Sequence, residues 1–419
     1  MHGEATVPGD KSVSHRAAIL GGIANGTTRI RNFLPATDCH ATLEVMRGLG
    51  IQVDYTPDEV LVHGRGLRGL SESLRPLDCG GSGTTMRLIA GLLAGQPFYS
   101  VLAANAQLSK RPMDRVAVPL RLMGANIMGR SNGRYAPLSI VGGSLHGIQY
   151  KMPVASAQVK SAILLAGLFA EGPTEVVEPA PSRDHTELML RAMGAQVSTD
   201  GNVVSIVPTS TLDSLDVRVP GDISSAAFLM AAAAIVPGSR VVIPGVGLNA
   251  GRVGILNVLL RMGAPLRLHN ERLDNGEPVA DIEIEYGQLR GTFISPEEVP
   301  GLIDELPILA VIATQVEGVT EVRGAAELRV KETDRIATTV TELRRMGAKI
   351  EALPDGFIVE GPVRLHGADV SSHGDHRLAM SLAVAALAAD GETTVDDTAC
   401  IDDSFPGFEQ ALEAIGVTL

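Results

Sequence analysis

Short hydrophobic runs rich in Ala and Gly recur along the chain, and each is followed by a glycine and a β-branched strand pattern. The first run covers residues 17–24, ends near Gly26 and leads into a predicted strand at 27–30. This composition predicts a closely packed helix, and glycine readily adopts the left-handed conformation that ends many helices. The same succession occurs six times, at Gly26, Gly95, Gly172, Gly238, Gly318 and Gly391.

A second helix pattern alternates with the first and ends in a tripeptide similar to Met-Gly-Ala, followed directly by a strand. Its glycines are separated by 74, 70, 69, 84 and 69 residues, which indicates an internal repeat. They are Gly50, Gly124, Gly194, Gly263, Gly347 and Gly416. The longest interval contains an insertion at 269–284, for which we predict a structural surface hairpin that turns at Asn275-Gly276.

Alternating helices and strands predict an α/β fold. A chain of 419 residues, 45% of them hydrophobic, is long enough to form two domains with substantial cores. We predict that repeats one to three occupy residues 12–221 and repeats four to six residues 222–419, with the break near 217–222.

Composition excludes several classes of protein. The longest apolar run, 226–236, has 11 residues and is too short to span a bilayer. The chain starts without the pattern of a secretion signal or transit peptide, and its three cysteines lack metal-ligand spacing, so we expect a reducing cytoplasm. The ten histidines form no ligand pair, so no metal site is predicted. A net charge of −13 argues against nucleic acid as the main partner.

The predicted helix starts combine ordinary capping residues with cations. Ser, Thr or Asp is the expected N-cap, but Lys and Arg in a first turn oppose the helix dipole. A bound anion would reverse that penalty, because backbone N–H groups and cations would act on it together. We therefore predict a site for strongly anionic small molecules, lined by helix starts from both halves. The openings are 10–16 (DKSVSHR), 81–87 (GSGTTMR), 111–115 (RPMDR), 156–160 (SAQVK), 182–187 (SRDHTE), 221–225 (GDISS), 249–252 (NAGR), 304–307 (DELP), 329–335 (RVKETDR) and 374–377 (GDHR).

Four carboxylates lie beside these cations and are candidates for general acid or base catalysis. They are Asp304, Glu305, Glu332 and Asp375. Glu332 is the strongest candidate by this criterion, because it directly follows Lys331.

Nearly all of these openings, in this order and along the full chain, resemble those of the EPSP synthase (3-phosphoshikimate 1-carboxyvinyltransferase) family. The sequences GDKS at 9–12 and SAQVK at 156–160 are similar to its class II members. The resemblance implies two similar domains, each with three βαβαββ repeats around a pseudo-threefold axis, an inside-out α/β barrel. It also implies that residues 1–11 belong with 222–419 and that the active site lies in the cleft between the domains.

The implied reaction transfers the enolpyruvyl group of phosphoenolpyruvate to the 5-hydroxyl of shikimate 3-phosphate and releases phosphate, in the pathway to chorismate and the aromatic amino acids. The resemblance implies a monomer that uses no cofactor or metal and is a target of glyphosate. It assigns shikimate 3-phosphate to Lys11, Ser12, Arg16, Ser156, Ala157, Gln158, Ser182, Asp304 and Lys331. It assigns phosphoenolpyruvate to Lys11, Gly83, Arg111, Gln158, Arg335 and Arg377.

The resemblance also implies catalytic roles. Asp304 takes or orients the proton of the 5-hydroxyl, and Lys11 and Glu332 are alternatives for protonating the enolpyruvyl methylene and for the later proton removal. The sequence departs from the usual family pattern at Gly81, Ala104-Asn105, Ala157, Gly251 and Asp403, with Ala104-Asn105 where Gly-Asp is common. Gly81 replaces an Asn, Gly251 a Thr and Asp403 a Lys, which concerns binding of the second substrate more than the class of reaction.

Two alternatives remain open. The UDP-N-acetylglucosamine enolpyruvyl transferases share this architecture, but they typically use a mobile-loop Cys, and none of Cys39, Cys79 or Cys400 lies near Arg111 in the sequence. A non-catalytic anion-binding relative would be expected to lack some of the residues that the family uses in catalysis, whereas Lys11, Asp304 and Glu332 are all present.

Overall fold

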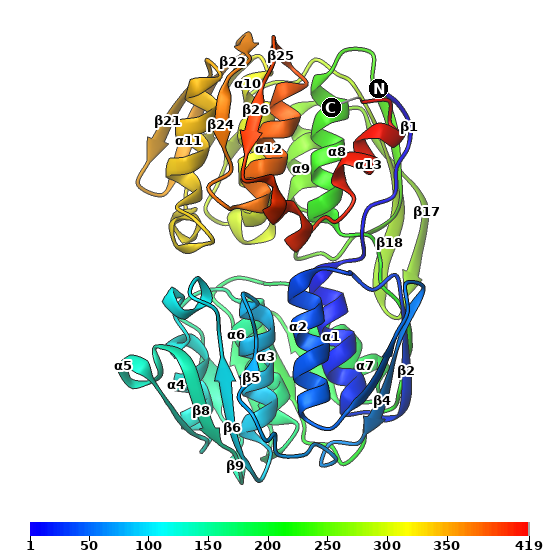
Figure 1. The fold of residues 1–419 in the computed structure, drawn as a ribbon, viewed down its shortest axis with the longest axis vertical. Coiled ribbons are helices and arrows are strands. Elements are labelled where there is room, and N and C mark those ends of the chain that lie inside the picture. The colour runs from blue at the N-terminus through cyan, green and yellow to red at the C-terminus, as the bar shows by residue number, and fades with distance from the viewer. Residues whose placement is uncertain (418–419) are drawn as a thin grey trace. The chain divides into compact units, whose positions relative to one another are not determined.

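The computed structural model describes residues 1–417, which form two compact units (Figure 1). We call the first the N-terminal unit; it contains Gly9–Val219 and the short segment Asp274–Glu277. The C-terminal unit contains Met1–Pro8, Pro220–Leu273 and the chain from Pro278 onward. Each unit has its own hydrophobic core.

The N-terminal unit is built on three four-stranded sheets with the same topology. Their strand orders are β15-β2-β4-β3, β5-β6-β8-β7 and β10-β12-β14-β13, and in each the first pair is parallel and the others antiparallel. A further pair, β9 with β11, is parallel. The strands are β2 (Asn25–Arg31), β3 (Gln52–Tyr55), β4 (Glu59–Arg65), β5 (Leu77–Asp78), β6 (Tyr99–Ala103), β7 (Asn126–Gly129), β8 (Tyr135–Val141), β9 (Leu145–His146), β10 (Gln149–Lys151), β11 (Ala170–Glu171), β12 (Thr174–Val177), β13 (Val197–Asp200), β14 (Val203–Ile206) and β15 (Asp216–Arg218).

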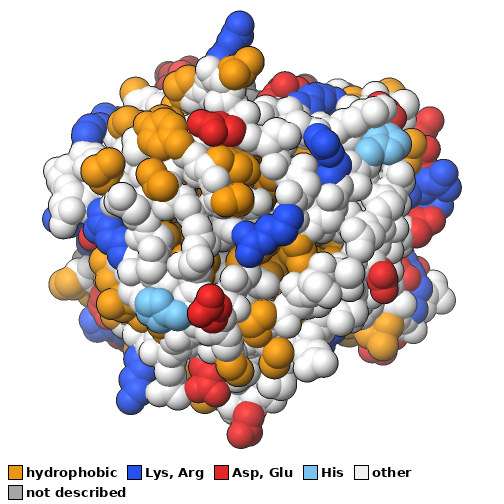
Figure 2. Space-filling view, turned by 90° about the horizontal axis from the view of Figure 1, so that it is seen from below, with side chains coloured by type: hydrophobic (Ala, Val, Ile, Leu, Met, Phe, Trp, Pro, Cys, Tyr) orange, Lys and Arg blue, Asp and Glu red, His pale blue; other side chains and the backbone are white. Residues whose placement is uncertain are grey.

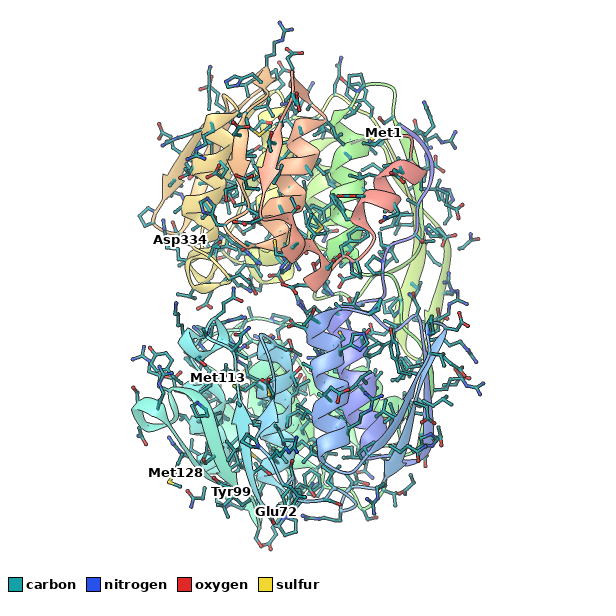
Figure 3. The ribbon with its side chains drawn as sticks, in the orientation of Figure 1. Met1, Glu72, Tyr99, Met113, Met128 and Asp334 are labelled. Carbon is teal, nitrogen blue, oxygen red and sulfur yellow. The ribbon has the colours of Figure 1, made fainter. Side chains whose placement is uncertain are left out.

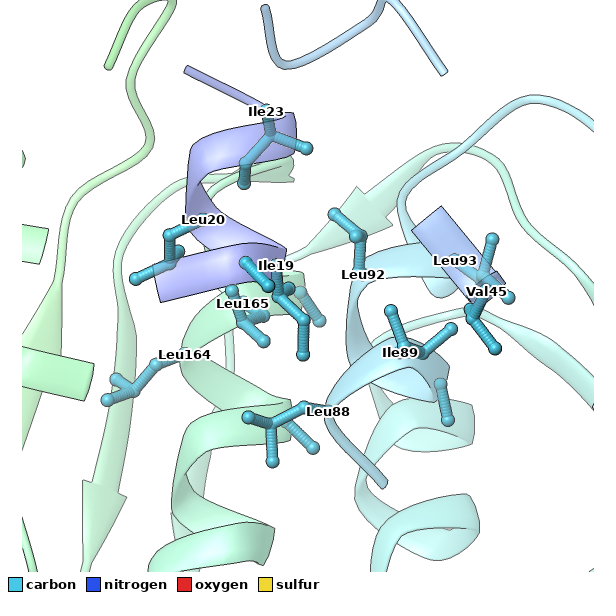
Figure 4. Close-up of a cluster of buried hydrophobic side chains, with 14 of the residues drawn as sticks. Ile19, Leu20, Ile23, Val45, Leu88, Ile89, Leu92, Leu93, Leu164 and Leu165 are labelled. Atoms are coloured by element: carbon cyan, nitrogen blue, oxygen red, sulfur yellow. The ribbon is translucent and has the colours of Figure 1, made fainter. Parts of the chain in front are cut away.

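Three buried helices form the centre of this unit: α1 (Lys11–Gly22), α3 (Gly83–Ala94) and α6 (Ala157–Gly167). Their apolar side chains interlock, with Ile19, Leu88 and Leu164 each contributed by a different helix (Figure 4). Small residues allow this proximity, since a Cβ on Gly91 would lie 2.1 Å from the carbonyl oxygen of Ala162. The remaining helices are α2 (Thr37–Gly48), α4 (Asp114–Leu122), α5 (Arg130–Gly133) and α7 (His185–Ala192).

The C-terminal unit repeats this arrangement with two four-stranded sheets, β1-β16-β18-β17 and β19-β20-β22-β21. Its remaining strands form the parallel pairs β23 with β25 and β24 with β26. The strands are β1 (His2–Glu4), β16 (Arg240–Gly247), β17 (Leu266–Asp274), β18 (Glu277–Glu285), β19 (Phe293–Ile294), β20 (Gly318–Val322), β21 (Lys349–Leu353), β22 (Gly356–Gly361), β23 (Leu365–His366), β24 (Asp369–Ser371), β25 (Ala389–Asp390) and β26 (Thr394–Asp396).

The helices of the C-terminal unit again belong to the two predicted patterns. Those of the first pattern are α8 (Ile223–Ile235), α10 (Leu306–Thr314) and α12 (His376–Ala386). Those of the second pattern are α9 (Gly254–Met262), α11 (Arg335–Arg345) and α13 (Phe408–Ala414). All described sheets have open strand orders, and the predicted α/β fold class is confirmed.

The glycine pattern is confirmed for the second helix type and is partly wrong for the first. All six second-pattern glycines have positive φ, from +85° at Gly50 to +108° at Gly124. The prediction that the first helix ends near Gly26 is wrong, because α1 ends at Gly22 and Gly26 lies inside β2 with φ +98°. Gly95 caps α3 in the right-handed region, at φ −88°. The strand predicted after Gly416 would include residues 418–419, which lie outside the described part of the chain.

The predicted hairpin at Asn275-Gly276 is confirmed. It joins β17 to β18, and both turn residues have positive φ, at +51° and +84°, as a two-residue turn with the twist of the strands requires. The hairpin tip, Asp274–Glu277, packs as part of the N-terminal unit. There Oε1 of Glu277 is 2.6 Å from Nδ1 of His185, and both residues are buried.

Figure 2 shows one face of the molecule, on which hydrophobic side chains are interspersed with charged ones. Across residues 1–417, no helix has both the length and the apolar character needed to cross a membrane.

Candidate active site

Arg16 is a buried cation of the N-terminal unit whose partners are neutral oxygens. Its Nε donates to Oγ1 of Thr186 (2.7 Å), Nη2 donates to Oγ of Ser161 (2.8 Å) and Nη1 donates to the carbonyl of Ser12 (3.0 Å). Burial lowers the pKa of Arg16 to about 10, against the opposing charge of Glu187. Its positive charge therefore lies in a site where it is poorly solvated, and an anion placed beside it would be favoured.

Lys11 begins α1, directly after the N-cap Asp10, whose carboxylate accepts from the amide of Val13 (2.9 Å). Its Nζ lies 2.6 Å from Oδ2 of Asp38 on α2, and both side chains are partly exposed. Gly81 is close to this pair, because a Cβ there would lie 3.8 Å from Oδ1 of Asp38. The pair places a solvent-accessible cation at the start of a buried helix.

The loop before α3 lies among arginine side chains. A Cβ on Gly83 would approach Nη1 of Arg87 to 2.8 Å and Nη1 of Arg111 to 3.5 Å. Arg87 donates a short hydrogen bond to Oε1 of Gln158, and Nε2 of Gln158 donates to Oγ1 of Thr84 (2.8 Å). The structure thus brings three predicted residues, Gly83, Arg111 and Gln158, around one guanidinium group.

Ser156, Ala157 and Gln158 lie together at the start of α6, where Oγ of Ser156 accepts from the amide of Val159 (3.4 Å). Ser182 lies just before α7 and donates a short hydrogen bond to Oε1 of Glu178. The predicted substrate-binding residues of this unit therefore lie at or near the starts of α1, α3, α4, α6 and α7.

Arg335 is the corresponding buried cation of the C-terminal unit, and its partners are carboxylates. Nε and Nη2 donate to the two oxygens of Asp375 (2.7 and 3.1 Å), and Nη2 lies 2.6 Å from Oε2 of Glu332. Burial alone would lower the pKa of Arg335, but the charges of Asp375, Glu332 and Asp304 raise it above its usual value. In return, Arg335 holds the pKa of Asp375 below its usual range despite the complete burial of that carboxylate.

Asp304 lies between two cations of the same unit. Its Oδ1 is 3.3 Å from Nζ of Lys331 and 3.5 Å from Nη1 of Arg335. Arg377 donates through Nη1 to the backbone carbonyl of Asp304 (3.0 Å). The structure therefore brings together all of the site residues predicted for this unit, namely Asp304, Lys331, Glu332, Arg335 and Arg377.

A second buried carboxylate, Glu305, lies next to Arg377. Its Oε1 is 3.6 Å from Nη1 of Arg377 and accepts a short hydrogen bond from Ser224. Nη2 of Arg252 donates both to Ser224 (2.5 Å) and to Asp222 (2.8 Å), the N-cap of α8. Arg252 and Arg377 are thus joined through one hydroxyl and one carboxylate.

The predicted capping holds for five of the six first-pattern helices, whose N-cap side chains accept amide protons. These N-caps are Asp10, Ser82, Ser156, Asp222 and Asp375. Within residues 1–417, Glu305 before α10 makes no such bond, since a 3-10 turn (Ile303–Glu305) precedes that helix. Among the second-pattern helices, Asp334, labelled in Figure 3, caps α11 by accepting from Ala337 (3.0 Å).

The prediction that second-pattern cations lie in the first helical turn is mostly wrong. Arg111 precedes α4, which starts at Asp114, and Arg252 precedes α9, which starts at Gly254. Arg335, which begins α11, and Arg115, the second residue of α4, do lie in a first turn. Lys160, four residues after the N-cap of α6, is also no candidate for anion binding, because Glu178 (2.8 Å) and Glu187 (2.7 Å) hold its ammonium group in the core.

Several residues of these clusters were missed by the sequence reasoning. Asp38 and Glu178 lie outside the predicted openings and contribute no cation, so helix-start chemistry does not select them. Thr186 lies inside the predicted opening at 182–187 but was not assigned a contact. Arg87 was within reach, since it ends the predicted opening at 81–87, but it was not assigned a contact. Within residues 1–417, no group of three or more His, Cys, Asp or Glu side chains is arranged to hold a metal ion.

Comparison with known proteins gives a consistent result. A family model described as EPSP synthase (3-phosphoshikimate 1-carboxyvinyltransferase) matches residues 1–412. A 3-phosphoshikimate 1-carboxyvinyltransferase of Desulforudis audaxviator is 52% identical over 416 residues, covering 99% of this chain and 97% of that protein. The enzyme of that name from Pelotomaculum thermopropionicum is 53% identical over 420 residues, covering 100% and 97%. A solved EPSP synthase structure from Acinetobacter baumannii has a TM-score of 0.91 at 47% identity, covering 100% of this chain and 96% of that one.

Proposed function

Since the chain belongs to the EPSP synthase family, we propose that it catalyses the enolpyruvyl transfer from phosphoenolpyruvate to the 5-hydroxyl of shikimate 3-phosphate. The products are 5-enolpyruvylshikimate 3-phosphate and inorganic phosphate, on the pathway to chorismate and the aromatic amino acids. Both substrates are phosphorylated carboxylates, which suits the cation-rich clusters of the two units.

The observation that carries this proposal is the position of Asp304 between Lys331 and Arg335, at 3.3 and 3.5 Å. A binding protein for anions gains nothing from carboxylates at its cations, because they repel the ligand. A transferase needs them, since a proton must leave the 5-hydroxyl and another must reach the methylene carbon. The combination of Asp304 and Glu332 with bound cations therefore favours catalysis over anion storage.

We assign the substrates to residues of both units. Shikimate 3-phosphate is bound by Lys11, Ser12, Arg16, Ser156, Ala157, Gln158, Ser182, Asp304 and Lys331. Phosphoenolpyruvate is bound by Lys11, Gly83, Arg111, Gln158, Arg335 and Arg377. We further propose, from the sequence repeat, that each unit is a three-repeat domain and that both units contribute residues to substrate binding.

In the addition step, Asp304 accepts the proton of the 5-hydroxyl while the oxygen of this hydroxyl attacks C2 of phosphoenolpyruvate. A proton is delivered to C3, which becomes a methyl group in the tetrahedral intermediate. In the elimination step, the methyl group loses a proton and phosphate leaves, which restores the double bond. Lys11 and Glu332 are the candidates for these two proton transfers at C3.

We further propose a monomeric, cytoplasmic enzyme that glyphosate inhibits at the phosphoenolpyruvate site.

The direct test is phosphate release from phosphoenolpyruvate in the presence and absence of shikimate 3-phosphate. Release that requires shikimate 3-phosphate supports the proposal. Release that requires UDP-N-acetylglucosamine instead would assign the chain to the other enolpyruvyl transferases. Binding of both anions without any turnover would indicate a non-catalytic relative.

A further inference from the structure

Ser182, proposed above to contact shikimate 3-phosphate, has a hydroxyl group that is already held by a buried carboxylate. It donates a short hydrogen bond to Oε1 of Glu178, which follows β12. The three residues between them are Pro179, Ala180 and Pro181, and two prolines restrict the backbone of so short a loop. The hydrogen bond to Glu178 and the proline-containing loop together restrict the orientations available to the Ser182 hydroxyl.

Glu178 is in turn fixed by Lys160 of α6. Nζ of Lys160 lies 2.8 Å from Oε2 of Glu178 and donates to the carbonyl of Ser182 at 3.2 Å. Lys160 is 1% exposed and Glu178 is 5% exposed. Because Gln158 and Ser156 begin the same helix, this ammonium group ties the start of α6 to the segment that carries Ser182.

A second buried carboxylate lies beside the ammonium group of Lys160. Its Nζ also lies 2.7 Å from Oε1 of Glu187, whose pKa is raised by burial. The charge of Glu187 also acts on Arg16, which is bonded to the neighbouring Thr186. Two buried carboxylates thus hold the ammonium group of Lys160, so Lys160 is not available to neutralise a substrate.

We propose that Glu178, held by Lys160, is a positioning residue that orients the Ser182 hydroxyl so that its oxygen accepts from a hydroxyl group of shikimate 3-phosphate. The inference rests on the proposed function, since it takes the ligand of Ser182 from it. A pre-oriented hydroxyl loses less conformational entropy when the ligand binds than a free one does. Glu178 should therefore affect the affinity for shikimate 3-phosphate and have little effect on the chemical steps.

The test compares Glu178→Gln, Ser182→Ala and the double variant, with Glu171→Gln as the matched control. Glu171 lies on β11 in the same unit and is exposed. Calorimetric titration gives the Kd for shikimate 3-phosphate, and steady-state rates give KM for each substrate and kcat. We expect Glu178→Gln to raise this Kd about tenfold, the scale of a hydrogen bond to a charged group, while kcat and the KM for phosphoenolpyruvate change by less than about twofold.

The double variant distinguishes positioning from general stability. If Glu178 acts through Ser182, Glu178→Gln should add little to the effect of Ser182→Ala. Additive losses, or equal losses for both substrates, would overturn the inference. Glu178→Asp keeps the charge for Lys160 but is one methylene shorter, so it provides the same test if Glu178→Gln does not fold. An unchanged Kd in Glu178→Asp would also overturn it.

The wild-type protein separates this inference from the proposed function. If it fails to bind shikimate 3-phosphate, the proposed function is wrong. If it binds and turns over both substrates while the Glu178 variants have normal affinity, only the positioning role is wrong.

Discussion

The two units each bury one arginine among the proposed substrate contacts, but they surround it with opposite chemistry. Arg16 of the N-terminal unit donates to two hydroxyl groups and a carbonyl, and its pKa is lowered to about 10 by burial. Arg335 of the C-terminal unit is bound by Asp375 and Glu332, and their charges raise its pKa. The charge of Arg16 is therefore left available to a ligand, whereas the charge of Arg335 is already neutralised by carboxylates.

This difference suggests a division of labour between the units. A poorly solvated cation with neutral partners binds a phosphate or carboxylate without first releasing another anion. A cation surrounded by carboxylates binds a second anion less readily, but the same carboxylates can accept and donate protons. We therefore propose that the N-terminal unit supplies most of the contacts to shikimate 3-phosphate, and that the C-terminal unit supplies the carboxylates for proton transfer, with Lys11 of the N-terminal unit as the other candidate.

Removal of the Asp375 charge should have the largest effect. Asp375→Asn keeps the shape and the cap of α12 but breaks a fully buried ion pair with Arg335. We expect the free energy of unfolding at pH 7 to fall by about 3–5 kcal/mol. Urea denaturation measures it, with the exposed Asp369→Asn as the control. A loss as small as in the control would show that Glu332 and Asp304 suffice to neutralise Arg335.

The same variant predicts a pH dependence. The pKa of Asp375 is lowered in the folded protein, so its stabilising effect is complete above the unfolded value of about 3.9 and is lost as the pH falls toward the folded one. Wild type should therefore lose more stability than Asp375→Asn on acidification below about pH 4. Parallel stability curves for the two proteins would contradict this assignment.

Substitution of Asp304 should have the next largest effect and act on catalysis. Asp304→Asn removes the base for the 5-hydroxyl but keeps a side chain that Lys331 and Arg335 can contact. We expect kcat to fall about 100-fold or more, with much of the substrate binding retained. Steady-state phosphate release checks this, again with Asp369→Asn as the control. An unimpaired kcat would remove Asp304 from the mechanism and weaken the division of labour between the units.

A smaller effect should appear in the N-terminal unit at a higher pH than that of Asp375. His15 is buried, its Nδ1 lies 2.6 Å from Oγ1 of Thr42, and burial lowers its pKa to about 3. Between about pH 6.5 and pH 3 the unfolded chain binds a proton at His15 that the folded one excludes. The free energy of unfolding therefore decreases as the pH is lowered through this range.

The expected slope from His15 is up to about 1.4 kcal/mol per pH unit. His15→Asn keeps a polar group near Thr42 and should flatten the curve in this window. His146→Asn, at an exposed histidine of the same unit, should leave the slope nearly unchanged. If both variants keep the wild-type slope, His15 is protonated in the folded protein.

The sequence predicts the repeat well because the repeat depends on local rules. A left-handed glycine after each second-pattern helix is needed wherever a strand must turn back, and all six have positive φ. Gly26 was assigned to the wrong element, because a glycine inside a strand has the same sequence signal as one that caps a helix. Its φ of +98° depends on its position in β2 and does not follow from the local sequence.

Residue contacts across helices were harder to predict than the cations themselves. The basic residues were selected because the predicted helix starts placed them where they would oppose the helix dipole, but the partner of each depends on tertiary packing. Lys160 and Arg16 both lie near helix starts, yet Lys160 pairs with two glutamates whereas Arg16 binds hydroxyl groups. A chain position close to a helix start therefore does not tell whether a cation is available to a ligand.

The smallest effect expected is that of a methyl group at Gly83. A Cβ there would lie 2.8 Å from Nη1 of Arg87 and 3.5 Å from Nη1 of Arg111, so Gly83→Ala displaces flexible guanidinium groups and leaves the backbone in place. We expect wild type to be sensitive to glyphosate, although Asp403 in place of a Lys opposes this.

Gly83→Ala should weaken the longer inhibitor more than the compact phosphoenolpyruvate, by about 1 kcal/mol or roughly fivefold in the ratio of Ki to KM. Gly143→Ala is the control, since a Cβ there meets no atom of residues 1–417 within 4 Å. Equal inhibition constants for wild type and Gly83→Ala would place Gly83 outside the inhibitor site, and would remove the neighbouring Arg111 from the residues that distinguish the two ligands.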